Sequence, residues 1–119
     1  MRLEGKRGLV TAAGSGMGRA GAIRFSQEGA AVGVVDVDED AVASVVGEIE
    51  KKGGKAKGIV ADLTKDADSE KIVTETAKYF NGLDFVWNHV GYPGPASVEG
   101  VEMDDFDLTL DLNLRTILI

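Results

Sequence analysis

The stretch VTAAGSGMGRA, residues 10–20, follows the apolar run of residues 8–10 and contains Gly14, Gly16 and Gly18. A strand that passes through such a turn into a helix is typical of phosphate sites, because the first N–H groups of the helix and its dipole favour an anion. Glycines also lack the Cβ atoms that would obstruct a phosphate. The spacing does not match G-x-G-x-x-G. An altered dinucleotide site, another phosphate loop and a turn without a ligand therefore all remain open at this point.

Apolar runs alternate with helical patterns along the rest of the chain. Short apolar runs predict strands at 8–13, 30–35, 56–61 and 83–87. Apolar residues at helical spacing predict helices at 16–28, from an N-cap at Asp38 to the pair at 53–54, from an N-cap at Thr64 through residue 80, and at 102–119. This order predicts right-handed βαβ units, and therefore an α/β fold with a Rossmann-type, doubly wound parallel sheet.

Composition restricts the function classes. A chain of 119 residues is expected to form one domain, covering 1–119. Its net charge of −7 argues against nucleic acid or an anionic membrane as a partner. With no cysteine and a single histidine, no metal site is expected. No apolar run is long enough to span a membrane, so a cytoplasmic protein is the default expectation.

Polar residues or glycines follow each predicted strand at the edge where parallel α/β sheets bind ligands. The glycine turn follows the first strand, and Asp36, Asp62 and Asn88 follow the next three. A carboxylate at Asp36 can accept hydrogen bonds from the ribose hydroxyls of an adenosine, and it would repel a 2′-phosphate. This charge pattern favours NAD over NADP as the cofactor.

In combination, these residues resemble the short-chain dehydrogenase/reductase family over the whole chain. Thr11, Gly16 and Gly18 are in register with its T-G-x-x-x-G-x-G turn, and Asp62 in VADLT matches its aspartate after the third strand. The segment at 88–91 is similar to its N-N-A-G motif, and Asn113 in LDLNLRT matches the asparagine of its catalytic tetrad, which serves a proton relay. The resemblance implies a cofactor site made of Gly14, Ser15, Gly16, Met17, Gly18, Asp36, Asp62, Leu63, Asn88, His89, Val90 and Gly91.

Three residues depart from the family pattern. Ala12 replaces the first glycine of the turn, which predicts a slight displacement of that turn. Val90 replaces a small alanine and His89 replaces the second asparagine, so His89 is interpreted as a structural variant. Asn113 also has a structural interpretation, as a helix kink or a link to the fourth strand, because its amide falls on an apolar helix face.

The family's Tyr-x-x-x-Lys pair is absent. Tyr79 is followed four places later by a leucine, and Tyr92 by an alanine. The resemblance therefore implies the cofactor half of a longer enzyme, truncated to a sheet of strand order 3-2-1-4. We expect this chain alone to be catalytically inactive, and its fourth strand to be an exposed edge.

The leading hypothesis is the NAD-binding portion of a short-chain oxidoreductase that acts on an alcohol or carbonyl substrate. The alternatives are a nucleotide-binding or sensor module without chemistry, and an interaction domain of flavodoxin-like topology. The helix at 102–119 carries two apolar stripes, which predicts one side on the sheet and the other in a homo-oligomer. Leu108, Leu112 and Ile119 are the expected oligomer stripe, and the other is Phe106, Leu110, Leu114 and Ile117.

Overall fold

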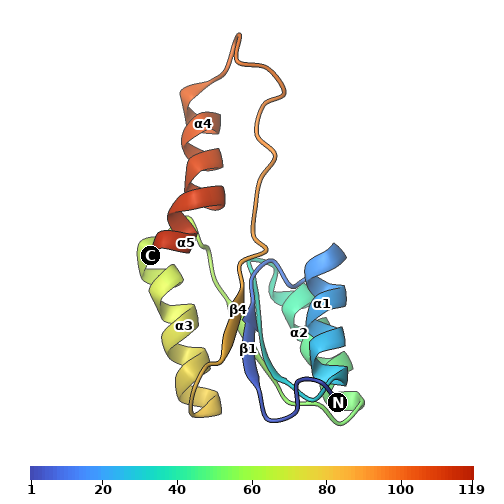
Figure 1. Cartoon of the computed structure of the whole chain (residues 1–119). Coiled ribbons are helices and arrows are strands. Elements are labelled where there is room, and N and C mark those ends of the chain that lie inside the picture. Colours follow the sequence, from blue (N-terminus) through green and yellow to red (C-terminus); the bar gives the residue numbers. More distant parts are fainter.

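Four parallel strands alternate with helices in a computed structural model that describes all 119 residues (Figure 1). The first half contains β1 (Arg7–Val10), α1 (Gly16–Gln27), β2 (Ala31–Asp36) and α2 (Glu39–Lys51). The second half contains β3 (Ala56–Val60), α3 (Asp66–Phe80), β4 (Phe85–Trp87), α4 (Met103–Leu110), a π-helical turn (Asp111–Arg115) and α5 (Thr116–Leu118).

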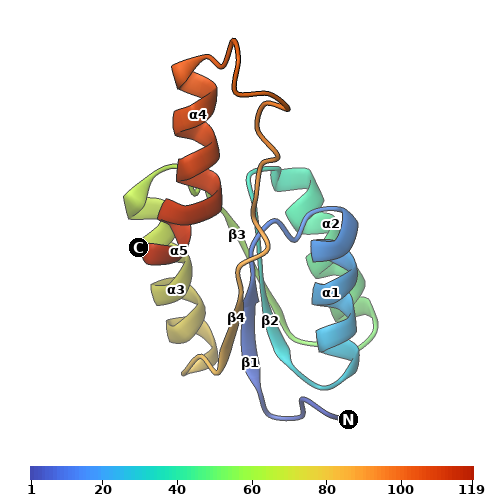
Figure 2. The same ribbon diagram turned by 45° about the horizontal axis from the view of Figure 1, so that its top comes forward.

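The sheet has the order β3-β2-β1-β4, which confirms the expected topology. This order differs from the 2-1-3-4-5 order of flavodoxin-like sheets, so the flavodoxin-like alternative is wrong. Helices α1 and α2 cover one face of the sheet and α3 covers the other (Figures 1 and 2). None of the helices has both the length and the apolar composition needed to cross a lipid bilayer.

Apart from Arg7 at the start of β1 and Asp36 at the end of β2, the central strands contain no polar side chain, because both of their faces are buried. Val10, Val32 and Val34 pack on the side of α1 and α2, together with Ala22, Val45 and Ile49. Leu9 and Val35 point to the other face, where they join Ile59, Ala61, Leu63 and Ile72. Two thin cores on opposite faces therefore hold the sheet, and its carboxyl edge is left open between the helix layers.

The first residues of α2 and α3 show whether the two predicted N-caps form. The Asp38 side chain accepts a hydrogen bond from the N–H of Ala41 at 3.1 Å, as expected of an N-cap. The predicted cap at Thr64 is wrong, because α3 begins one residue after Lys65. The hydroxyl of Thr64 instead donates to Asp62, which makes Thr64 part of the turn after β3.

The first strand is also shorter than expected. It ends at Val10, and residues 11–13 already form the turn toward α1.

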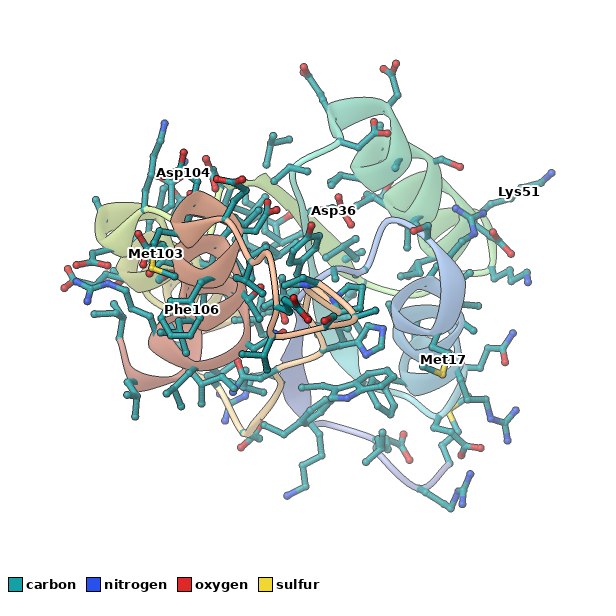
Figure 3. The ribbon with its side chains drawn as sticks, turned by 90° about the horizontal axis from the view of Figure 1, so that it is seen from above. Met17, Asp36, Lys51, Met103, Asp104 and Phe106 are labelled. Atoms are coloured by element: carbon teal, nitrogen blue, oxygen red, sulfur yellow. The ribbon has the colours of Figure 1, made fainter.

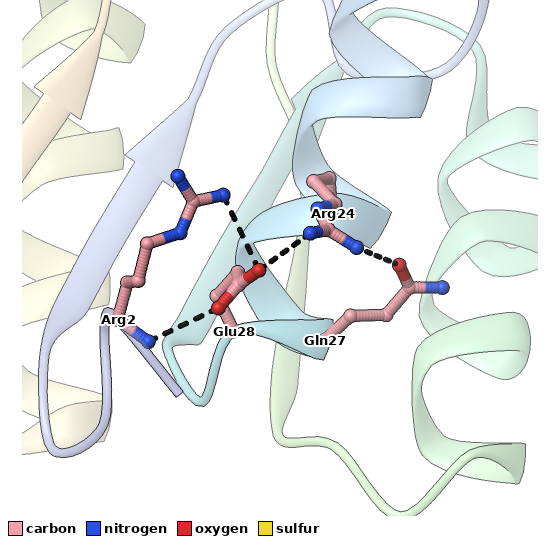
Figure 4. Close-up of polar contacts among 4 residues, drawn as sticks. All are labelled: Arg2, Arg24, Gln27 and Glu28. Carbon is pink, nitrogen blue, oxygen red and sulfur yellow. Dashed lines mark hydrogen bonds and ion pairs between the residues drawn. The ribbon is translucent and has the colours of Figure 1, made fainter.

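An ion cluster closes the opposite end of the sheet, where the Glu28 carboxylate accepts hydrogen bonds from the backbone of Arg2 and from the guanidinium of Arg24 (Figure 4). The backbone and side-chain hydrogen bonds of Arg2, followed by the charges of Arg2 and Arg24, hold the pKa of Glu28 below its usual value.

The C-terminal helical segment rises beyond the carboxyl edge of the sheet, beside the loop that follows β4 (Figures 1 and 2). A bidentate ion pair between Arg115 and Asp66, with Nε to Oδ1 at 2.8 Å, fastens it to the start of α3. The expected packing of its two stripes is wrong in part. The stripe expected on the sheet, Phe106, Leu110, Leu114 and Ile117, is 44–54% exposed. In the expected oligomer stripe, Leu108 and Leu112 are half-buried, whereas Ile119 is 46% exposed.

Candidate functional site

The predicted site residues gather at the carboxyl edge of the sheet. Figure 3 looks down on this edge, with Asp36 between α2 and the last helix and Met17 on α1 at the rim. Four connections meet here: the turn from β1 to α1, the turn after β2, and the segments that follow β3 and β4. The arrangement follows from the parallel sheet, because all of its strands end on the same side.

Thr11 joins the ends of β1 and β4. Its hydroxyl oxygen accepts hydrogen bonds from the N–H groups of His89 at 2.9 Å and Val90 at 3.0 Å, and it lies 3.4 Å from the carbonyl of Trp87. The side chain is buried. This threonine therefore fixes the segment after β4 beside the glycine turn. From the sequence, Thr11 is assigned only a place in the register of the motif. A hydroxyl at the end of a buried strand is nevertheless a signal that the residue can hold a neighbouring segment.

Gly18 and Gly16 are required in this turn for different reasons. A Cβ at Gly18 would lie 2.1 Å from the carbonyl oxygen of Ala12, so that helix α1 and the turn could not approach one another. Gly16 has φ +56°, and no heavy atom lies within 4 Å of its Cβ position. The open side of Gly16 is thus the approach to the start of α1. The first turn of α1 carries no acidic residue and no side-chain cap. These N–H groups are free to bind an anion.

Ala12 occupies the position at which the family that the sequence resembles has the first glycine of the turn. Its φ is +51°, one of only two positive values at non-glycine residues. The backbone thus adopts the left-handed conformation that glycine favours, despite the Cβ.

The Asp36 carboxylate lies across the mouth of the glycine turn. One oxygen accepts the N–H of Gly14 at 2.9 Å, and the other accepts those of Val37 at 2.8 Å and Asp38 at 3.2 Å. No lysine or arginine pairs with it. The carboxylate is therefore oriented by backbone dipoles alone, and it presents negative charge to the edge of the sheet.

Asp62 is oriented by its own turn. Its Oδ1 accepts hydrogen bonds from the hydroxyl of Thr64 at 2.6 Å and from the N–H of that residue at 3.0 Å. These bonds, the hydroxyl first, hold the pKa of Asp62 below its usual value. Its Oδ2 makes no hydrogen bond within the chain and can accept one from a ligand.

A cavity of about 260 Å³ connects the two carboxylates. Its volume is near the lower end of small-molecule pockets and suits a part of a dinucleotide, such as an adenosine, better than the whole molecule. A larger hollow of about 1040 Å³ lies at the amino ends of the strands and includes none of the predicted site residues. The smaller cavity is lined by Ala12, Val35, Asp36, Val37, Ala61, Asp62, Leu63, Thr64, Val90 and Leu112.

The segment after β4 divides into two parts. Val90 enters the cavity, whereas the exposed Asn88 makes no side-chain hydrogen bond within the chain. The His89 ring lies 4.7 Å from the Trp87 ring, centroid to centroid. It also touches the start of α1, since a Cβ at Gly18 would be 2.9 Å from it. This packing agrees with the interpretation of His89 as a structural variant.

Asn113 lies in the π-helical turn and links it to the loop after β4. Its Oδ1 accepts the N–H of Tyr92 at 2.8 Å, and its Nδ2 donates to the carbonyl of Tyr92 at 2.7 Å. A Cβ at Gly91 would lie 2.9 Å from that Oδ1. The side chain therefore acts as a two-point clamp, as in the structural interpretation of this residue. A π-helical turn often marks a functional site.

The structure thus brings only part of the predicted set around one cavity. Asp36, Asp62, Leu63 and Val90 line it, together with Ala12. The remaining predicted residues lie outside it: Gly14 and Ser15 in the turn before α1, Gly16, Met17 and Gly18 in the first turn of α1, Asn88, His89 and Gly91 after β4, and Asn113 in the π-helical turn.

Comparison with known proteins agrees with the resemblance found in the sequence. Residues 6–119 match the family model described as short chain dehydrogenase. An oxidoreductase of Thermotoga maritima is 36% identical over 115 residues, which cover 97% of this chain and 45% of that protein. The chain spans just under half the length of the curated relatives it matches.

Two solved structures are similar along nearly the whole chain. A 7α-hydroxysteroid dehydrogenase in complex with NADH and 7-oxo glycochenodeoxycholic acid is 32% identical, with a TM-score of 0.93 over 98% of this chain and 46% of its own. A short chain dehydrogenase of Burkholderia cenocepacia in complex with NADP is 34% identical, with a TM-score of 0.94 over 99% and 49%. These neighbours therefore include complexes with both forms of the nicotinamide cofactor.

Proposed function

The chain belongs to the short-chain dehydrogenase family, and we propose that it forms the NAD-binding portion of an oxidoreductase. The parent enzyme would transfer a hydride between the nicotinamide and an alcohol or carbonyl carbon of a small molecule. The nicotinamide supplies the hydride acceptor or donor when it is bound, and this chain contributes the residues that bind and orient it.

One observation carries the choice of NAD: the position of the Asp36 carboxylate. It lies at the end of β2, accepts the N–H of Gly14 and borders the cavity. The two hydroxyls of an adenosine ribose would bind such a carboxylate as donors, whereas a 2′-phosphate would face its negative charge. No cation pairs with Asp36 to offset that repulsion.

The other residues fit the remaining parts of a dinucleotide. The open side of Gly16 and the free N–H groups of α1 suit a pyrophosphate. The cavity offers apolar walls at Leu63 and Val90 for a purine, and the free Oδ2 of Asp62 can accept from its amino group. Asn88 and Gly91 would border the nicotinamide half.

Asn113 would belong to the proton relay of the parent enzyme. Its side chain is fully engaged with Tyr92, so it would contribute by fixing the π-helical turn and the loop after β4. Without a Tyr-x-x-x-Lys pair, this chain alone would bind the cofactor and not turn over substrate.

Self-association through the last helix is a further part of the proposal. The exposed stripe of Phe106, Leu110, Leu114 and Ile117 offers an apolar surface, and a second copy of the chain would cover it. Light scattering at tens of micromolar tests this: a dimer that the L114E variant converts to a monomer supports it, and a monomeric wild type contradicts it.

Calorimetric titration with NAD⁺ and NADP⁺ tests the cofactor assignment. Replacing Asp36 by alanine removes at least one charge-assisted hydrogen bond worth about 1.5–3 kcal/mol, so NAD⁺ affinity should fall at least about 10-fold while NADP⁺ affinity changes little. Asp40→Ala, which changes an exposed carboxylate in the first turn of α2, is the matched control and should leave both affinities unchanged. Equal losses for both nucleotides in D36A would refute the ribose assignment.

A further inference from the structure

Ala12 occupies a backbone conformation that its side chain disfavours. Only Ala12 and Asn81 combine a side chain with a positive φ, at +51° and +59°. In the left-handed region the Cβ crowds the backbone, whereas glycine pays no such cost. A methyl group at this position thus persists against the local preference of the chain.

The turn gives Ala12 no freedom to relax. On one side, Thr11 is buried and bound to the backbone after β4. On the other, Ala13 is fully buried and its N–H donates to the carbonyl of Val35 at 2.9 Å. The carbonyl of Ala12 itself packs against Gly18. Three neighbours therefore impose the conformation, and strain of this kind tends to be retained where it serves a site.

Ala12 is also part of the cavity wall. It is half-buried and borders the same space as Asp36, Val90 and Leu112. A ribose bound to the Asp36 carboxylate would lie in this space, next to residue 12.

We propose that the methyl group of Ala12 contacts the adenosine ribose. The same methyl group lowers the stability of the ligand-free turn and raises the affinity for the nucleotide. The inference rests on the proposed nucleotide site. It assigns a binding role to the one position where the turn departs from glycine.

The test separates stability from binding in the variant Ala12→Gly. Glycine removes the strain, so the Tm of the empty protein should rise by roughly a few degrees. It also removes one methyl contact, so the affinity for ADP-ribose and that for NAD⁺ should each fall by about fourfold in calorimetry. ADP-ribose lacks only the nicotinamide base, so an equal loss for both probes excludes that base as the contact of the methyl group.

Asn81→Gly is the matched control. It relieves the other positive φ, at the end of α3, and changes no atom of the cavity. Its affinity for both probes should equal that of the wild type.

The possible outcomes are distinct. An A12G protein that binds ADP-ribose as tightly as the wild type, or more tightly, overturns the contact while leaving the nucleotide site intact. An equal loss of affinity in N81G also overturns it, because the effect would then come from backbone flexibility. A wild-type chain that binds neither probe contradicts the nucleotide site, and the contact falls with it.

Discussion

The Asp36 carboxylate and the backbone N–H of Gly14 are joined by a hydrogen bond of 2.9 Å, which ties the end of β2 to the glycine turn after β1. The two segments are separated by the whole of helix α1. Through this bond, the acid that would read the ribose and the turn that would hold the pyrophosphate form one unit.

Replacing Gly14 by alanine should break this unit. The added Cβ would lie 2.8 Å from Asp36 Oδ2 and 2.9 Å from the Cβ of Ala41. Overpacking of this kind costs about 1–3 kcal/mol, which urea denaturation can measure. Gly47→Ala is the control, because no atom lies within 4 Å of its Cβ position in α2 and alanine favours a helix. G47A should stabilise the protein; a G14A protein as stable as the wild type would show that the turn shifts freely.

Thr11→Val should destabilise the fold while keeping its shape. Valine removes the oxygen that accepts the N–H groups of His89 and Val90, and the position is buried. Leaving buried donors without a partner costs about 1–3 kcal/mol in the free energy of unfolding.

Thr11→Ser is the control for this change, because serine restores the hydroxyl and loses only a methyl group. Its free energy of unfolding should lie closer to the wild-type value than that of T11V. A larger loss in T11S than in T11V would assign the role of Thr11 to packing.

Lowering the pH should decrease the stability of the folded protein, in part because Asp84 becomes protonated. Its carboxylate pairs with the side chain and backbone N–H of Arg7, and these contacts lower its pKa from 3.8 to about 2. A carboxyl with a lowered pKa in the folded state stabilises above its unfolded pKa, and this stabilisation is lost as the pH falls from about 4 toward 2. In Asp84→Asn, the Tm should be lower than that of the wild type near neutral pH, and the difference should shrink over that window.

Asp107→Asn is the matched control, because Asp107 is exposed and its side chain makes no hydrogen bond in the chain. Its Tm should follow the wild-type pH profile. A D84N difference that stays constant down to pH 2 would contradict the pairing with Arg7.

Asn113→Ala should release the loop after β4. Both polar atoms of the amide hold the backbone of Tyr92, at 2.7 and 2.8 Å. Hydrogen exchange of the Tyr92 amide should accelerate in N113A. Asn113→Asp keeps the acceptor for this N–H, so its exchange should stay closer to that of the wild type. Equal exchange in all three proteins would show that the loop is held by other contacts.

The sequence predicts the positions of Asp36, Asp62 and the glycine turn well, because they follow buried strands whose periodicity is clear. It does not predict the bonds of Thr11, since their partners follow β4, more than seventy residues later. Nor does it predict the positive φ of Ala12, which depends on the contacts that its neighbours make in the folded turn. The sequence also does not predict which apolar face of the last helix is exposed, because periodicity identifies apolar faces without showing what covers each of them.

The nucleotide site is tested most directly by mapping backbone amide shifts in NMR spectra during titration with NAD⁺. Saturable shifts should concentrate at the carboxyl edge of the sheet, at Gly14, Gly16, Val37 and Leu63, while Gly53 at the opposite end stays unchanged. Shifts that centre on the hollow near Gly53, or no saturable shift at millimolar NAD⁺, would contradict a nucleotide site at this edge.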